Sequence, residues 1–130
     1  MDKHPSLENQ AVIDLPLLIK TVDSSGPLWG TESEQLDATL LFWRRGEGIA
    51  RHVNDEVDVL IMFLKGSAVV SIGEQELVST TGQVVLIPRG SERSLVALED
   101  CAHLNVHQRR KKLSPMATVG SYQKRQLPES

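Results

Sequence analysis

Glycine-bounded apolar runs are the feature that most constrains how this chain can fold. Turn signals at Gly66, Gly73, Gly82 and Gly90 recur every seven to nine residues through the second half of the sequence. Short apolar or alternating segments lie between them, without a helical period. Short strands at this spacing are typical of a sandwich or a closed barrel. The pattern therefore predicts an all-β fold.

The segment 36–43 shows the alternation most clearly, because every second residue from Leu36 to Phe42 is apolar. Apolar or alternating runs predict further strands at residues 57–64, 67–72, 76–79, 84–87, 94–98 and 102–106. The earlier segment 13–22 is apolar but contains Pro16, and it fits either a short helical turn or an irregular strand. Residues 24–27 read as a turn cluster.

With 130 residues, the chain has the length of one domain with short appendages. We expect an N-terminal arm over residues 1–28, a barrel over 29–107 and a basic tail over 108–130. The lone Cys101 cannot form an internal disulfide, which suits a reducing compartment. There is no leader-like N-terminus, and the longest apolar run, 59–64, is too short to span a bilayer. We therefore expect a cytoplasmic protein with no membrane partner.

The charge is divided unevenly along the chain. Residues 1–107 carry eight Lys or Arg and sixteen Asp or Glu, a net charge of −8, whereas residues 108–130 carry six and one, a net charge of +5. A basic tail can contact nucleic acid. This one has a single aromatic residue, Tyr122, and offers no stacking platform. We expect a solvated tail, or one that lies against the acidic body or a partner subunit, and no nucleic-acid partner.

Two segments resemble the sequence motifs of the cupin family. In the first, Gly46 is followed by five residues and His52, and Gly66 closes the motif. In the second, Gly82 is followed by five residues and a Pro-Arg-Gly turn at 88–90. The resemblance is to small single-domain bacterial cupins. It implies a cupin double-stranded β-helix, or jelly-roll barrel, and a homodimer.

The resemblance also implies where a metal would bind, and there the sequence departs from the family. Metal-binding cupins use two His, one Glu and a third His, followed by an Asn. The matching positions here hold, in order, His52, Asn54, Val59, Arg93 and Ala97. Transition-metal sites need three or four imidazole or carboxylate donors, and a guanidinium repels a cation. Asp58 or Glu56 could replace the Glu only by a register shift, and Asp58 adjoins Val59 on a strand and so faces the other side. We therefore expect a degenerate site with no tightly bound metal and no cofactor.

His52 and Asn54 are two residues apart, so on a strand they share a face. If the resemblance holds, that face and Arg93 both point into the barrel. A buried Arg needs a partner, which is either a protein carboxylate such as Asp58 or Glu56, or a bound anion. We expect His52, Asn54 and Arg93 to bind a small acidic ligand. The alternative is a purely structural network in which Arg93 is paired internally.

The last predicted strand carries His103, Asn105 and His107 in alternation with Leu104 and Val106. We expect the apolar pair to face the core, which leaves the polar residues on the surface or toward a dimer partner. Core packing is expected of Trp29, Trp43 and Phe63.

Three classes of function are open. The first is a metal-free cupin that binds a small, anionic molecule without turning it over, and we favour it over an enzyme. The second is a cupin enzyme, either isomerase- or epimerase-like with His52 as acid or base, or oxygenase-like with a weak metal at His52. The third is a dimeric interaction protein. Fold alone does not decide among them.

Overall fold

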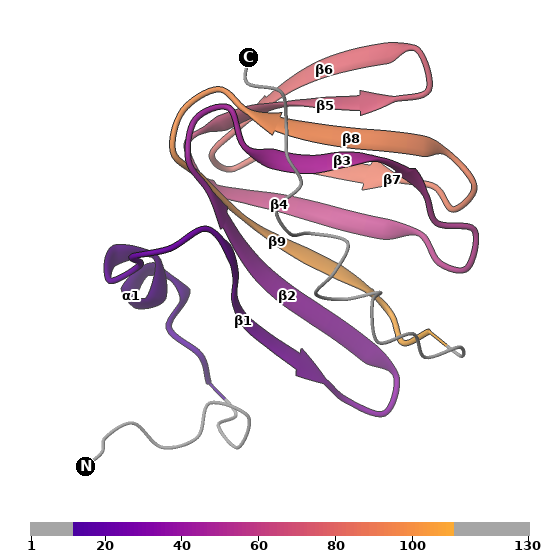
Figure 1. Cartoon of the computed structure of the whole chain (residues 1–130). Coiled ribbons are helices and arrows are strands. Elements are labelled where there is room, and N and C mark those ends of the chain that lie inside the picture. Colours follow the sequence, from indigo (N-terminus) through magenta and orange to yellow (C-terminus); the bar gives the residue numbers. More distant parts are fainter. Residues whose placement is uncertain (1–11, 111–130) are drawn as a thin grey trace.

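The computed structural model describes residues 12–110 and shows one short helix and nine strands in two facing layers (Figure 1). The elements are α1 (Leu15–Lys20), β1 (Gly26–Glu32), β2 (Leu36–Trp43), β3 (Gly48–Val53), β4 (Val59–Lys65), β5 (Ser67–Ile72), β6 (Gln75–Thr80), β7 (Val84–Ile87), β8 (Glu92–Ala97) and β9 (Cys101–Gln108). The predicted all-β fold is confirmed.

The strands form a five-stranded sheet in the order β1-β2-β9-β4-β7 and a four-stranded sheet in the order β3-β8-β5-β6. Every strand pairing is antiparallel. Neighbours such as β2 and β9 are far apart in sequence, as in a jelly roll.

Two strands, β1 and β3, were not predicted from the sequence pattern. Strand β1 starts at Gly26 inside the expected turn cluster, and its register with β2 shifts between Pro27 and Trp29. The register of β3 with β8 shifts between Ile49 and His52. A bulge adds a residue and breaks the alternation from which a strand is recognised.

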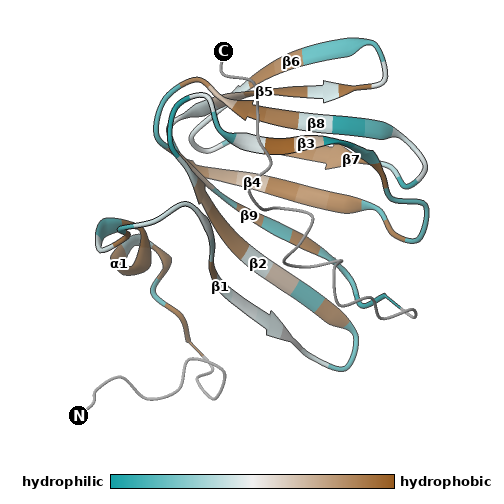
Figure 2. Cartoon of the chain, in the orientation of Figure 1, coloured by the Kyte–Doolittle hydropathy of each residue, from teal (hydrophilic) through white to brown (hydrophobic). Residues whose placement is uncertain are grey.

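The main core lies between the two sheets. Strand β4 supplies Val59, Ile61 and Phe63 from one layer, and β5 and β8 supply Val70 and Leu95 from the other. Figure 2 shows β4 as a nearly continuous hydrophobic strand in the middle of the molecule. This packing holds the inner faces of the sheets at a fixed separation and so shapes the space between them.

A second apolar cluster lies on the outer face of the five-stranded sheet. It joins Ile19 of α1 to Leu40, Phe42 and Ala102 on β2 and β9. The helical alternative for the segment 13–22 is correct, since the Asp14 carboxylate caps α1 by accepting a hydrogen bond from the Leu17 N–H at 3.1 Å. Among residues 12–110, no helix is long and apolar enough to cross a membrane.

The β4–β5 turn requires glycine at position 66. Gly66 has φ of +73°, and a Cβ placed there would lie 2.0 Å from the carbonyl oxygen of Asp100. A side chain would therefore be strained by its backbone conformation and would clash with backbone atoms.

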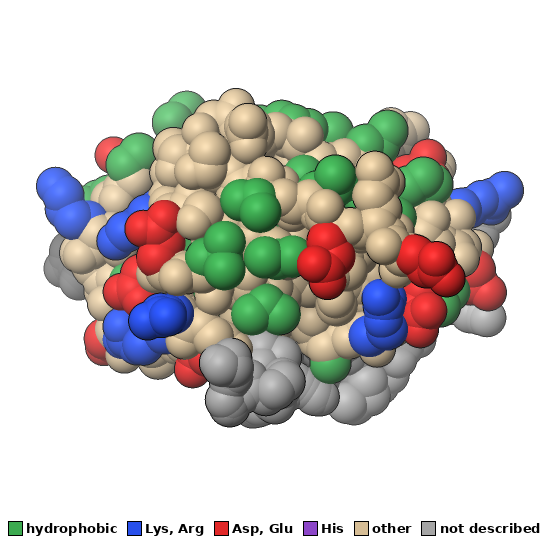
Figure 3. Space-filling view, turned by 90° about the horizontal axis from the view of Figure 1, so that it is seen from above, with side chains coloured by type: hydrophobic (Ala, Val, Ile, Leu, Met, Phe, Trp, Pro, Cys, Tyr) green, Lys and Arg blue, Asp and Glu red, His purple; other side chains and the backbone are tan. Residues whose placement is uncertain are grey.

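The outer face of the four-stranded sheet is partly apolar. Figure 3 looks down on this side of the molecule and shows hydrophobic side chains gathered near its centre. Val69 of β5 pairs with Val78 of β6 and Val96 of β8, so the three form a row across the strands. Val78 is 67% exposed.

Candidate functional site

A pocket between the two sheets brings together the three residues predicted as a site. His52 of β3, Asn54 just after it and Arg93 of β8 all line this pocket. Its remaining polar lining comprises Ser94, Asn105, His107 and Arg110. The pocket contains about 470 Å³ of space that no atom fills, part of it open to solvent. Only about 30 Å³ of this space is wide enough to be occupied by the centre of a water molecule. The pocket therefore suits a molecule of a few non-hydrogen atoms.

Arg93 is a buried cation in the pocket wall, with 6% of its surface exposed. Its Nε donates to the carbonyl oxygen of Ser91 at 2.8 Å, and Nη2 donates to that of Pro88 at 3.2 Å. These bonds hold the guanidinium against the β7–β8 turn. Of the two expected carboxylate partners, Asp58 instead accepts a hydrogen bond from the backbone N–H of Arg89 at 2.8 Å.

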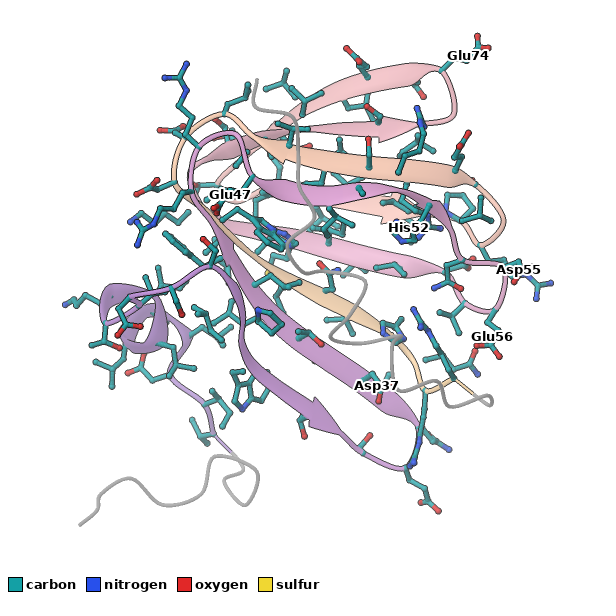
Figure 4. All side chains as sticks on the ribbon, viewed as in Figure 1. Asp37, Glu47, His52, Asp55, Glu56 and Glu74 are labelled. Atoms are coloured by element: carbon teal, nitrogen blue, oxygen red, sulfur yellow. The ribbon has the colours of Figure 1, made fainter. Side chains whose placement is uncertain are left out.

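His52 pairs with Arg93 in the register of β3 and β8, and Figure 4 shows it on the side of β3 that faces β4. Its Nδ1 lies 2.8 Å from the carbonyl oxygen of Ala50. A carbonyl only accepts, so Nδ1 carries the proton and Nε2 is the ring atom left for a ligand. Burial lowers the pKa of His52 most, and the positive charges of Arg93 and Arg110 lower it further, although the bond to Ala50 raises it.

Asn54 shapes the loop between β3 and β4, where Figure 4 places Asp55 and Glu56. Its Oδ1 accepts hydrogen bonds from the N–H groups of Glu56 at 2.9 Å and Val57 at 3.3 Å. These bonds form an Asx turn and fix the orientation of the amide. The Nδ2 atom is buried without a hydrogen-bond partner among the described residues, and so is Nε of Arg110. Two donor nitrogens on residues that line the pocket therefore lack an acceptor.

The predicted orientation of β9 is wrong. His103 is fully buried and Asn105 is 6% exposed, and both face the inside of the sandwich. Leu104 packs instead on the cluster beneath α1. His107 is half-buried and lines the pocket, with its Nδ1 2.8 Å from the carbonyl oxygen of Gln108. Because α1 covers the outer face of the sheet, apolar residues of β9 are needed on that face as well.

The inward residues of β9 extend a buried polar chain from the core to the pocket. Trp43 Nε1 donates to His103 Nε2 at 3.0 Å, and His103 Nδ1 lies 2.8 Å from Asn105 Oδ1. The His103 ring also packs on Phe63, with the ring centroids 5.5 Å apart. Burial lowers the pKa of His103 to about 4, although its hydrogen bond to Asn105 raises it. The imidazole is therefore neutral at pH 7.

The residues at the four metal-ligand positions of the cupin motif do not fit a metal ion. Val59 has no donor atom and lies in the core, and Arg93 is a permanent cation. Within residues 12–110, no three His, Cys, Asp or Glu side chains gather as a metal site would require. His52 alone offers an imidazole at these positions, so the metal chemistry of the motif has no ligand set here.

The fold and the pocket define a small all-β protein of the jelly-roll class, with a cavity between its sheets that both polar and apolar side chains line. Its architecture is that of the cupins. The fold matches KdgF from Halomonas sp., with a TM-score of 0.58 and 21% identity over 62% of this chain and 74% of that one. It matches a cupin-2 domain protein from Shewanella frigidimarina, with a TM-score of 0.65 and 18% identity over 75% and 95%. It also matches the Cnp3 cupin domain of Schizosaccharomyces pombe, with a TM-score of 0.62 and 16% identity over 75% and 73%. At these identities the similarity shows the fold alone. The sequence matches no protein-family model and no curated protein sequence.

Proposed function

We propose that this protein binds a small anion in the pocket between its sheets without using a tightly bound metal. The composition of the wall carries the proposal. Arg93 and Arg110 line the pocket, none of its described lining residues is acidic, and Nδ2 of Asn54 and Nε of Arg110 have no acceptor among the described residues. A carboxylate or phosphate oxygen supplies acceptors for these two nitrogens, together with a negative charge that complements the guanidinium groups.

Each residue has a distinct part in this binding. The Arg93 guanidinium supplies fixed positive charge where water is largely excluded, so its attraction for an anion is only weakly screened. Asn54 donates through Nδ2. Neutral His52 presents a lone pair on Nε2 and takes up a proton when an anion lies beside it, since a nearby negative charge favours the protonated ring.

The test compares Arg93→Gln with Arg89→Gln, whose side chain is exposed on the adjacent turn. Calorimetric titration with phosphate, oxalate, pyruvate and propionate should detect binding of at least one anion by the unmodified protein. Loss of a charge-assisted hydrogen bond should weaken that binding roughly 10- to 100-fold in Arg93→Gln and leave Arg89→Gln unchanged. Equal affinities in the two variants, or no binding of any anion, would refute the proposal.

A pH series separates the part played by His52 from that of Arg93. Affinity should rise as the pH falls from 7.5 to 5.5, because the complex holds a proton on His52 that the empty pocket does not. In His52→Gln the affinity should change little over this range. A probe whose own charge is constant in this window, such as pyruvate, keeps the comparison clean.

The state of His52 favours proton transfer as a second candidate function. A neutral imidazole oriented by the Ala50 carbonyl, with Nε2 toward the pocket, is placed as a general base for an isomerase- or epimerase-like reaction. Exchange of carbon-bound hydrogen for deuterium in a bound oxo acid, followed by NMR, tests it against His52→Gln. The oxygenase-like alternative is tested by elemental analysis, where a stoichiometric transition metal would count against a metal-free pocket.

The homodimer and the cytoplasmic location remain predictions. Light scattering on the full chain and on a chain ending at His107 tests the first, together with any contribution of the basic tail to assembly. Fractionation of the native host tests the second.

A further inference from the structure

The buried chain from Trp43 to Asn105 has only one consistent hydrogen-bond direction. The indole N–H can only donate, so His103 Nε2 accepts from it at 3.0 Å. A neutral imidazole that accepts at Nε2 carries its proton on Nδ1, and this N–H donates to the Asn105 carboxamide oxygen at 2.8 Å. The indole N–H of Trp43 therefore determines which atoms of His103 and Asn105 donate and which accept.

The end of the chain is the Asn105 amide, which lines the pocket. Its oxygen is engaged by His103, so its nitrogen is the end that remains for other contacts. A carboxamide can be turned over at little steric cost, but here the reversed orientation would place its N–H₂ against the His103 N–H. The hydrogen-bonded chain of Trp43, His103 and Asn105, called the relay below, therefore excludes that orientation. Asn105 presents its N–H₂ donor to the pocket.

The polar groups of the pocket come from both walls. Arg93 and His52 belong to the four-stranded sheet, whereas Asn105 belongs to β9 of the facing five-stranded sheet. A molecule whose anionic group lies against Arg93 therefore presents its other end toward the five-stranded sheet, where Asn105 offers a hydrogen-bond donor.

We infer that Asn105 contacts the ligand. Trp43 and His103 are positioning residues, which hold the amide nitrogen of Asn105 toward the ligand. This rests on the proposed anion binding and narrows the ligand class. The preferred ligand is a small carboxylate that also carries an uncharged hydrogen-bond acceptor, such as a carbonyl oxygen, on the side away from the carboxylate. A plain aliphatic acid places its negative charge against Arg93 but offers no acceptor to the Asn105 donor.

The experiment uses matched acids that differ only by a carbonyl oxygen: pyruvate against propionate, acetoacetate against butyrate, and levulinate against pentanoate. Calorimetric titration of the full chain should show that one oxo acid binds roughly 2- to 10-fold more tightly than its partner, as expected for one neutral hydrogen bond. The pair with the largest ratio of affinities shows which separation of carboxylate and carbonyl oxygen fits between Arg93 and Asn105.

Variants assign that preference to the relay. Asn105→Leu should bind the two acids of the pair equally and keep its affinity for the plain acid. His103→Leu and Trp43→Phe should lose most of the preference, because the amide can then turn over. His103→Gln should keep the preference for the oxo acid that His103→Leu loses, since the Gln oxygen can accept from Trp43 while its N–H₂ donates to Asn105.

The outcomes distinguish this inference from the proposed function. If the plain acids bind but no pair shows a preference, or if the preference survives in Asn105→Leu, the inference fails while anion binding stands. If no acid binds, both fail. Long-range ¹H–¹⁵N spectra of the free protein give a second, ligand-independent check. They should show His103 protonated on Nδ1, and protonation on Nε2 would overturn the relay even if His103→Leu does not fold.

Discussion

Acidification from pH 7 to pH 4 should destabilise this fold through His103. The ring is fully buried and makes its hydrogen bonds as a neutral imidazole, and the residues that contact it, Trp43, Phe63 and Asn105, are all uncharged. In the unfolded chain the same ring takes up a proton at the ordinary pKa of His, near 6.5. Below that pH the unfolded state holds more protons at this site than the folded state, so the free energy of unfolding falls as the pH falls.

The size of the effect follows from the two pKa values. The pKa of His103 drops from 6.5 in the unfolded chain to about 4 in the fold. At about 1.4 kcal/mol per unit, the loss amounts to about 3 kcal/mol, accumulated between pH 6.5 and pH 4 and constant below that. A loss of this size is a large part of the roughly 5–15 kcal/mol that stabilises an ordinary domain.

Urea unfolding followed by tryptophan fluorescence measures this loss at half-unit steps of pH. His103→Gln keeps both hydrogen-bond partners but cannot titrate, so its stability relative to the unmodified protein should improve by about 3 kcal/mol between pH 7 and pH 4. His107→Gln serves as the control, because that ring is not enclosed in the core. Parallel pH curves for His103→Gln and the unmodified protein would refute the reasoning.

Two further predictions concern the fold itself. Gly66→Ala should lower the free energy of unfolding by more than about 2 kcal/mol, because strain at φ +73° adds to the clash with Asp100. Gly73→Ala, at φ +62° with open space around it, should cost only about 1–2 kcal/mol of strain. Equal losses in urea titrations of the two variants would contradict this. Burial, aided by the charge of Glu99, raises the pKa of the Cys101 thiol to about 12. A disulfide reagent at pH 8 should therefore modify it only after unfolding, and rapid reaction with the native protein would show that this strand opens.

The strands could be predicted because they depend on local spacing, whereas the first three site residues were predicted from the resemblance to the cupin motifs. Alternation and glycine turns define β2 and β4 to β9 without knowledge of tertiary contacts. The two-residue separation of His52 and Asn54 puts them on one face of a strand, and the match to the second motif places Arg93, just after the Pro-Arg-Gly turn, on the neighbouring strand β8. These three residues lie around one pocket.

The remaining pocket residues depend on what covers the outer face of the sheet. In β9 the apolar residues alternate with polar ones, and a strand with one solvated face would turn Leu104 inward. Here Leu104 faces the cluster around α1, so the inner face receives His103 and Asn105, which are tolerated because they satisfy each other and Trp43. The apolar segment 13–22 could have indicated this orientation of β9. If it is interpreted as a helix, its apolar side must pack on one face of a sheet. Arg110 was assigned to the basic tail, and no local pattern indicates that it lines the pocket.

In the proposed binding mode, the two sheets contribute different parts of the selectivity of this pocket. The four-stranded sheet supplies the guanidinium of Arg93, and Arg110, just after β9 of the other sheet, adds a second positive charge to the wall. Replacing Arg93 by His would remove one of the two guanidinium groups that repel a cation but would not create a metal site. Val59 supplies no donor atom, and the Asn54 oxygen accepts hydrogen bonds from the backbone of Glu56 and Val57. The five-stranded sheet supplies Asn105, whose direction is set from Trp43 in the core. In this proposal the Arg93 charge and the Asn105 donor lie on opposite walls, and a change at one of these residues should alter one property while largely preserving the other.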